Sequence, residues 1–364
     1  MWVDFHWHAR DEEQSHKETI ARSLAVAEAA GLDAIAAMPN TERPLITLER
    51  CREYLTIARA VQSQVQFYVH IGLTADVEQV KYAIEAYRKE PAIIGMKAYW
   101  AHSTGNSGII REDDQYKVLE TLTKEGYDGV LVGHFEKQSL VQENLYDGNL
   151  MNWSTQCRPE AAEITSFQDV VTMAEKVKFQ GKLHIAHVST TEVVDSIASY
   201  TGSTKLSCGI TPHHLFLDCM ALKDENSTAW YKCNPPIRNP VTRVGLLERF
   251  LAGKISILES DHAPHTWKDK EKEIPASCCI AGPTWPYVIM ALEKLGMSAA
   301  GIHQTLFQRA VDLYGLDIQP GVRLVQWNIL QELQQQYPHD LTRAIVKSLL
   351  MRGIDISAAV GTRT

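Results

Sequence analysis

The chain has 364 residues, and 36 lysines and arginines against 44 aspartates and glutamates give it a formal net charge of −8. Hydrophobic residues make up 45% and charged residues 22%, which is ordinary for a globular protein and argues against disorder. The negative charge and the lack of a basic run argue against nucleic-acid binding. No apolar stretch approaches the ~18 residues of a membrane span, and residues 1–14 lack the basic and apolar regions of a signal peptide.

Seven cysteines, an odd number, are scattered along the chain without CxxC spacing. This pattern argues against a disulfide framework and against a structural zinc module. It favours buried thiols in a reducing compartment, so we expect a cytoplasmic protein. The adjacent pair Cys278 and Cys279 lies in a predicted loop, and the sequence assigns it no function.

Short apolar runs alternate with amphipathic stretches from the first residues onward. The runs predict strands at 2–6, 33–38, 65–71, 92–97, 129–132, 182–187, 205–208 and 255–259. Apolar residues at three- and four-residue spacing predict helices at 19–30, 48–61, 77–88, 115–125, 167–179 and 191–200. Eight strands alternating with helices predict an α/β fold, a closed (β/α)8 TIM barrel of parallel strands. No GxGxxG follows the first strand, which argues against a dinucleotide-binding domain.

We expect the barrel to occupy residues 1–320 and a helical C-terminal extension to occupy residues 321–364. Long loops are expected at 98–112, 136–160 and 261–283, and loops of this length in a compact barrel usually serve a function. The 98–112 loop is rich in Ser, Thr and Gly, which fits either a mobile lid over a site or a solvated loop.

Metal-binding residue types recur where the predicted strands end, which is where barrel enzymes carry their reactive groups. His6 and His8 are two apart on a strand, so both imidazoles face the same side and could chelate one metal ion. Alone, this pair also fits two structural histidines. His134, His187 and Asp261 end three further strands, and imidazole and carboxylate ligands suit zinc or another borderline divalent ion.

Lys97 ends the fourth predicted strand, and an ammonium group there would be repelled by bound divalent ions. One interpretation is a structural lysine paired with an acid. The other is a neutral lysine that carbon dioxide converts to a carbamate, whose two oxygens suit a bridge between two metal ions.

At this point the chain resembles the dihydroorotases, in the cyclic amidohydrolase branch of the amidohydrolase superfamily. The matching segments are DFHWHAR, SHKE, AMPNT, GMKAY, GHFE, CRPEAAE, HIAHVST, ITPHHLFL, CNPPIR and SDHAPHT, in the family's order over about residues 2–320. This branch usually carries a small β-sandwich. We expect no complete β-sandwich here, because the predicted barrel begins at residue 2 and the tail reads as helical.

The resemblance implies a site with two zinc ions. It places His6, His8 and Asp261 on one ion, His134 and His187 on the other, and carboxylated Lys97 between them. It also makes Asp261 the catalytic residue, which handles the proton of the bridging hydroxide.

For the substrate, the resemblance implies that Arg10, Asn40 and His265 hold a carboxylate, with Asn234 near the ring. Each of the first three also has a plain structural interpretation: a salt bridge at the rim for Arg10, a turn residue for Asn40 and a loop cap for His265. The segment after SDHAPHT departs from the family's usual Gly/Pro-rich loop, which puts ring contacts from that loop in doubt.

The expected reaction is the reversible cyclisation of N-carbamoyl-L-aspartate to L-dihydroorotate in de novo pyrimidine biosynthesis. The resemblance further implies a homodimer and an association with aspartate transcarbamoylase, with no nucleic-acid or membrane partner. Two alternatives stay open. One is another cyclic amidohydrolase, namely an allantoinase, hydantoinase or dihydropyrimidinase. The other is an inactive barrel that supports a transcarbamoylase.

Overall fold

The computed structural model describes the chain except residues 104–106, 223–227, 278, 319–323, 338–340 and 357–364. Eight parallel strands lie side by side in chain order. They are β1 Val3–Trp7, β2 Ala34–Ala37, β3 Gln66–Gly72, β4 Ile93–Tyr99, β5 Val130–His134, β6 Lys182–Ile185, β7 Lys205–Ile210 and β8 Ile257–Leu258. A bridge between Trp7 and His262 brings the chain after β8 beside β1. The predicted (β/α)8 barrel is confirmed.

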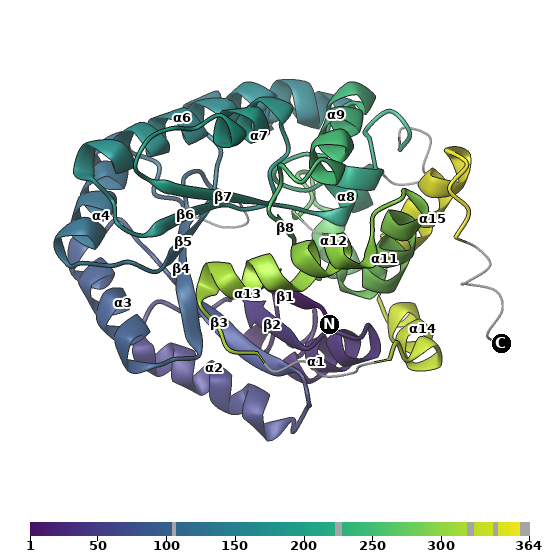
Figure 1. Ribbon diagram of the computed structural model, residues 1–364, viewed down its shortest axis with the longest axis horizontal. Helices are drawn as coiled ribbons and strands as arrows, with labels where there is room; N and C mark the ends of the chain where they lie inside the picture. The colour runs from purple at the N-terminus through teal and green to yellow at the C-terminus, as the bar shows by residue number, and fades with distance from the viewer. Residues whose placement is uncertain (104–106, 223–227, 278, 319–323, 338–340, 357–364) are drawn as a thin grey trace.

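The helices lie outside the barrel (Figure 1). They are α1 Ile20–Ala29, α2 Leu48–Ala60, α3 Val77–Lys89, α4 Glu112–Lys124, α5 Leu150–Asn152, α6 Glu160–Val177, α7 Thr191–Ala198, α8 Pro212–Phe216, α9 Pro240–Leu251, α10 Trp267–Lys270, α11 Trp285–Lys294, α12 Ala299–His303, α13 Arg309–Tyr314, α14 Trp327–Gln335 and α15 Thr342–Met351. Threonine side chains accept a backbone N–H at the start of α1 and α2, which fixes where these helices begin. Helix α6 begins seven residues before the predicted 167–179, because residues 160–166 continue the same helix.

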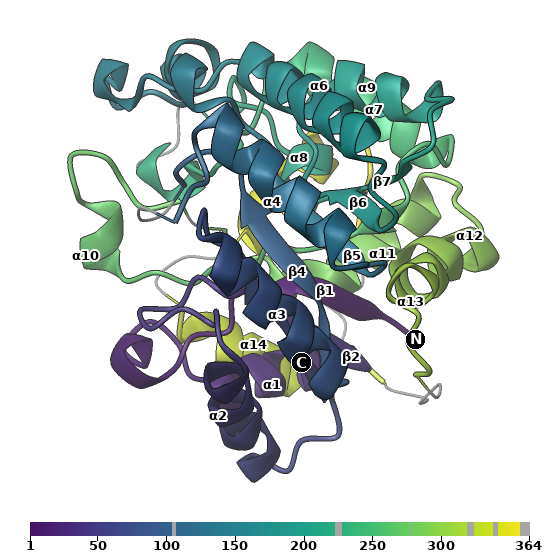
Figure 2. The ribbon, with the colours of Figure 1, turned by 90° about the vertical axis from the view of Figure 1, so that its left-hand side faces the viewer.

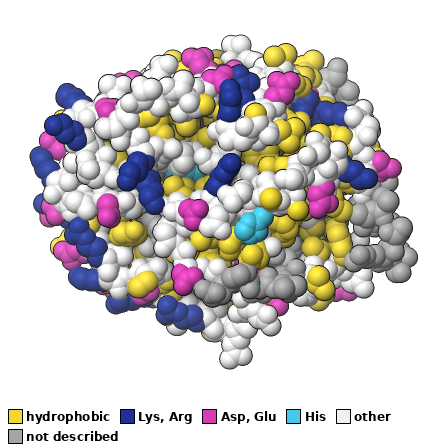
Figure 3. Space-filling view, in the orientation of Figure 1, with side chains coloured by type: hydrophobic (Ala, Val, Ile, Leu, Met, Phe, Trp, Pro, Cys, Tyr) yellow, Lys and Arg dark blue, Asp and Glu magenta, His cyan; other side chains and the backbone are white. Residues whose placement is uncertain are grey.

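The opening at the N-terminal ends of the strands is filled by the segment that ends in α13. Phe5 packs edge-on against Tyr314, with ring centroids 5.2 Å apart, and Val3, Phe307 and Val311 belong to the same buried cluster. Figure 1 shows α13 lying across this opening. On the same face, charged side chains lie mainly around the edge and hydrophobic ones gather toward the middle and right (Figure 3). The segment that ends in α13 therefore packs against β1 at this end of the barrel, and the candidate ligands lie at the opposite end.

The predicted long loops lie at the other end. Figure 2 shows α10, from the 261–283 loop, at the end of the barrel opposite the N-terminus. The 136–160 loop contains short helical turns, at Gln138–Leu140, Glu143–Leu145, Leu150–Asn152 and Trp153–Cys157. In the 98–112 loop, Trp100 and Ala101 are buried, whereas residues 104–106 lie outside the described part of the chain.

The tail forms two helices, α14 and α15, as the sequence predicts. Leu330, Leu341, Ile345 and Leu349 are fully buried in the main hydrophobic core, so the tail packs closely on the barrel. The boundary between residues 320 and 321 stays a prediction, because 319–323 lie outside the described residues. Across the described residues, none of the helices combines the length and apolar character that crossing a bilayer requires.

Candidate metal centre and substrate pocket

A pocket opens at the C-terminal ends of the barrel strands. Its lining comprises His6, His8, Arg10, Asn40, Lys97, Tyr99, Ser103, His134, His187, Asn234, Asp261, Ala263 and Ser277. Every site residue predicted from the sequence is therefore in the lining, with the exception of His265. Residues from strands far apart in the chain meet here because parallel strands all end at the same rim.

His6, His8 and Asp261 form the first group of possible metal ligands, with all three side chains buried. The Nε2 atoms of His6 and His8 lie 3.5 Å and 2.9 Å from Oδ1 of Asp261. Nδ1 of His8 donates a hydrogen bond to Oδ1 of Asn40 at 2.6 Å, so a neutral His8 presents a lone pair at Nε2. A lone pair and a carboxylate oxygen at this separation fit a shared cation.

His134 and His187 form the second group, one strand apart. His134 donates from Nε2 to Glu136 at 2.8 Å, which leaves its Nδ1 facing Nε2 of His187 at 3.3 Å. Burial lowers the pKa of both histidines, so both are held neutral, the form that binds metal ions. The ring of His187 also lies 5.0 Å from the ring of His6, which brings the two groups together.

Lys97 lines the same pocket as the two groups and is fully buried on β4. Its Nζ has no hydrogen-bond partner among the described residues, and it stands 5.1 Å from the centre of the Tyr99 ring. Burial lowers the pKa of Lys97 to about 8, although Glu259 and Asp261 act to raise it. A buried amine without a partner argues against the interpretation as a structural ion pair and fits a lysine that becomes carboxylated.

Two buried glutamates, Glu136 and Glu259, contact the candidate ligand histidines. Oε2 of Glu259 lies 3.5 Å from Nδ1 of His6, and its Oε1 accepts the backbone N–H of His187 at 2.5 Å. Oε2 of Glu136 accepts from His134 and is ion-paired with the buried guanidinium of Arg158. Carboxylates that accept from ligand histidines fix the ring orientation, as in many metal sites.

The backbone is strained at two of the candidate ligands. His187 and Asp261 have φ values of 40° and 51°, in the left-handed region that residues with side chains rarely adopt. His187 lies two residues after the end of β6, and Asp261 lies three residues after the end of β8. Strain of this kind persists where the surrounding structure enforces it, and it is concentrated at functional sites.

A buried cation lies at the edge of the same pocket. Arg10 is only 2% exposed, and its Nη1 donates to the backbone oxygen of Asn40 at 3.0 Å and to Gln14 at 3.3 Å. Asn40 therefore contacts both Arg10 and the ligand candidate His8. The guanidinium is positioned to receive an anionic group of a small molecule in the pocket.

Asn234 and His265 approach the site differently. Asn234 lines the pocket, its backbone N–H donates to Oγ of Ser277 at 2.9 Å, and its Oδ1 is buried without a partner. His265 lies behind the lining, where Nδ1 is 3.3 Å from Asp269 and 3.4 Å from Lys17. Its Nε2 is buried without a partner, and burial lowers its pKa to about 3.

Several residues of the site were not predicted from the sequence. Tyr99, Ser103, Ala263 and Ser277 line the pocket, and Glu136 and Glu259 support the histidines. A signal existed for the two glutamates, since each lies two residues from a candidate ligand in the chain. Ser277 gave no signal, because only the folded loop brings it beside Asn234.

Comparison with known proteins yields no matching family model. Curated relatives do match. A dihydroorotase from Methanosarcina mazei is 29% identical over 87% of this chain and 70% of its own length. Dihydroorotases from Methanosarcina acetivorans and Thermococcus kodakarensis are 29% and 30% identical, over 76% and 74% of this chain. The chain is similar to the dihydroorotases.

The match to dihydroorotases covers only part of some relatives, at 58% of the Methanosarcina acetivorans protein and 57% of the Thermococcus kodakarensis protein. Solved structures show the same barrel. An L-hydantoinase from Arthrobacter aurescens superposes with a TM-score of 0.78 at 19% identity, over 89% of this chain and 73% of that one. A dihydroorotase from Saccharomyces cerevisiae, in complex with 5-fluoroorotic acid, gives 0.67 at 20% identity, over 87% and 84%.

Proposed function

We propose that the protein is a dihydroorotase, a hydrolase of cyclic amides that interconverts N-carbamoyl-L-aspartate and L-dihydroorotate. One observation supports this most directly: the pocket combines a cluster of possible metal ligands with the buried guanidinium of Arg10. L-dihydroorotate combines a cyclic amide with a ring carboxylate. The amide would face the metal ligands, and the carboxylate would face the guanidinium of Arg10. Rings without a carboxylate would offer the guanidinium of Arg10 no anionic group for a charge-assisted hydrogen bond.

The residues present fit a binuclear metal site. His6, His8 and Asp261 would hold one zinc ion, and His134 and His187 the other, with carboxylated Lys97 between them. The close approach of acceptor atoms around Asp261, and the buried Lys97 Nζ without a partner, both support this set. When bound, such a pair of ions lowers the pKa of a water molecule and polarises the amide carbonyl.

Protein side chains would perform the remaining steps. Burial would raise the pKa of Asp261, but the neighbouring imidazoles of His8 and His6 hold this pKa below its usual range, so the carboxyl group is an anion. In hydrolysis, Asp261 would take the proton of the attacking water and pass it to the leaving ring nitrogen.

Substrate orientation would come from the other end of the pocket. Arg10 and Asn40 would bind the carboxylate, and His265 would join them through its buried Nε2. Asn234, whose Oδ1 is buried without a partner, would accept from a ring N–H. This arrangement would place the scissile amide bond beside Asp261.

The wider context is part of the same proposal. The reaction belongs to de novo pyrimidine biosynthesis in the cytoplasm. We further propose a homodimer that can associate with aspartate transcarbamoylase, as the similarity to dihydroorotases suggests.

The decisive experiment is an assay of the purified, zinc-supplied protein against dihydroorotate, dihydrouracil, hydantoin and allantoin in parallel. We expect dihydroorotate to be preferred, by ~10⁴-fold or more in kcat/KM, because a pocket built for a polar group strongly rejects analogues that lack it. A preference for a ring without the carboxylate would replace the proposal with a hydantoinase-like activity. A protein that binds no metal and turns over no substrate would instead be a scaffold.

A further inference from the structure

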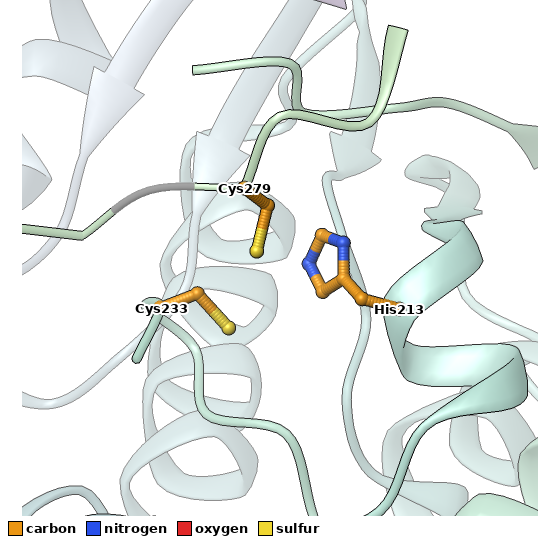
Figure 4. Close-up of side chains that lie close together, drawn as sticks. All are labelled: His213, Cys233 and Cys279. Atoms are coloured by element: carbon orange, nitrogen blue, oxygen red, sulfur yellow. The ribbon is translucent and has the colours of Figure 1, made fainter. Parts of the chain in front are cut away.

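A second cluster of metal-binding side chains lies outside the pocket lining. It consists of His213, at the start of α8, Cys233, and Cys279 in the loop after β8. Nδ1 or Nε2 of His213 and the two Sγ atoms all lie within 4.8 Å of one another, and the three residues are 0%, 1% and 1% exposed. Figure 4 shows the three side chains pointing toward one another from separate segments.

The buried imidazole of His213 is the first observation that points to a ligand for this cluster. Both of its ring nitrogens are buried, and the described residues give neither of them a partner of hydrogen-bonding geometry. Leaving a buried polar group unsatisfied costs about 1–3 kcal/mol, so native proteins rarely tolerate it without a ligand. A metal ion would bind one nitrogen directly.

The cysteines are suited to the same ion. Neither Cys233 nor Cys279 is in a disulfide. Burial would raise the pKa of the Cys233 thiol, but the neighbouring Cys279 and His213 lower this pKa, which favours the thiolate form that binds metals. A disulfide between the two sulfurs would use the cysteines alone and leave the imidazole without a partner. A metal ion uses all three groups.

The position of the cluster indicates what the ion would do. Cys233 directly precedes Asn234, and Cys279 follows Ser277 by two residues, so the cluster stands behind two residues of the pocket wall. The backbone oxygen of Cys279 also accepts from Ala263 at 2.9 Å, beside the loop that carries Asp261. An ion bound by all three side chains would tie together the segments that form this wall.

We propose that His213, Cys233 and Cys279 form a structural zinc site behind the active site, separate from the catalytic metals. Two thiolates and an imidazole are a set that zinc prefers, and they supply three of its four tetrahedral ligands. The inference does not depend on the proposed dihydroorotase activity, because the cluster would bind zinc whatever the pocket hydrolyses.

Cobalt(II) tests the site directly, because thiolate ligands give Co²⁺ an intense near-ultraviolet charge-transfer absorption that nitrogen and oxygen ligands do not. The full chain would be stripped of metal under reducing conditions and titrated with Co²⁺. We expect this absorption in the wild type and in Asp261→Asn, whose change is confined to the catalytic ligands. We expect its loss in Cys233→Ala and Cys279→Ala. Cys51→Ala, which removes a buried cysteine on α2, is the matched control and should keep the absorption.

Absence of the absorption from the wild type, or its persistence in Cys233→Ala, would overturn the proposal. If the cysteine variants do not fold, thiol labelling of the native wild type serves instead. In mild denaturant, where buried thiols become transiently accessible, zinc should slow the alkylation of Cys233 and Cys279 relative to the zinc-free protein, as read by peptide mass spectrometry. Equal labelling with and without zinc, or a Cys233–Cys279 disulfide in the native protein, would contradict the site. Neither result depends on turnover, so the proposed activity is tested separately.

Discussion

At the scale of single residues, three of the candidate ligand histidines are held by neighbours that the ligand pattern does not reveal. Asn40 accepts from His8, Glu136 accepts from His134, and Glu259 lies against His6. These contacts fix the ring nitrogens that face the pocket, and ligands aligned before binding need less ordering when the ion arrives. The buried charges of Arg10 and Lys97 complete the site and are the most informative residues to change.

Arg10→Met should separate the carboxylate end of the pocket from the metal end. Loss of a bidentate, charge-assisted contact should lower kcat/KM for dihydroorotate. The decrease should correspond to on the order of 2–4 kcal/mol of lost transition-state stabilisation. The measurement is kcat/KM for dihydroorotate and for dihydrouracil in the wild type and the variant. Turnover of dihydrouracil should hardly change, since it has no carboxylate to lose. An equal loss for both substrates would make Arg10 a structural residue.

Lys97→Ala should lose both metal content and activity. The reason is that a carbamate supplies two anionic oxygens between the ions, and no other described side chain in the pocket replaces them. Metal analysis of the variant, before and after addition of a small carboxylic acid, is the measurement. The acid should restore part of the bound metal by supplying the missing oxygens. An unmodified Lys97 in the intact mass of fully active wild type would contradict the carbamate.

At the scale of elements, strand β3 carries a buried histidine, His70, that is not among the candidate metal ligands. His70, on β3, is completely buried below the ligands, and its Nε2 donates to the backbone oxygen of Phe5 at 2.9 Å. Burial lowers the pKa of His70 from 6.5 to about 3, so the native barrel contains a neutral imidazole near neutral pH. The free energy of unfolding should therefore decrease in acid, because the unfolded chain can protonate this histidine and the native barrel cannot.

His70→Gln should make unfolding less dependent on pH. The native pKa of His70 lies below the unfolded value of 6.5, so its contribution is complete above pH 6.5 and is lost as the pH falls toward about 3. Between these pH values the unfolded chain binds a proton that the native histidine does not. The free energy of unfolding therefore falls by up to about 1.4 kcal/mol per pH unit. Urea unfolding of metal-free wild type and variant at several pH values between 6.5 and 4 measures this. Parallel pH profiles would contradict the assignment.

At the scale of the whole molecule, the tail helices are part of the barrel's core and also reach the strand ends. The hydroxyl of Tyr337, between α14 and α15, donates to the buried carboxylate of Glu18, which lies 3.0 Å from Nε2 of His262. His262 directly follows Asp261 and bridges to β1 at Trp7. The tail thus supports the turn at the end of β8 from outside the barrel.

Deletion of residues 325–364 should prevent stable folding. Leu330, Leu341, Ile345 and Leu349 are fully buried. At about 2 kcal/mol for each buried side chain, their loss approaches the entire free energy of unfolding of a typical domain.

The milder change Tyr337→Phe should lower the free energy of unfolding by about 1–3 kcal/mol, because Glu18 loses a buried donor. Denaturant unfolding of both forms is the measurement. A truncated chain that unfolds as cooperatively as the full chain would show that the tail is a separate extension.

Much of this organisation could be predicted from the sequence for a local reason. Strand and helix periodicities depend on neighbours in the chain, so all eight strands were found at about the right residues. Once the parallel barrel is known, strand ends must share one rim, which is why His6, His8, Lys97, His134 and Asp261 could be placed in one pocket. The start of α6 was misplaced, because Glu163 and Ser166 occupy buried positions of its first turns and interrupt the apolar period there.

Only the tertiary structure determined which side chains support this pocket. Glu259 reaches His6, and Tyr337 reaches Glu18, across distances in the chain that no local pattern encodes. The cysteines show the difference most clearly. Their spacing argued against a structural zinc module, yet closure of the barrel brings Cys233, Cys279 and His213 together. Sequence spacing reports ligands that share one loop or turn. His213 on α8 and Cys233 follow β7, whereas Cys279 follows β8, so they meet only because these two strands end at the same rim.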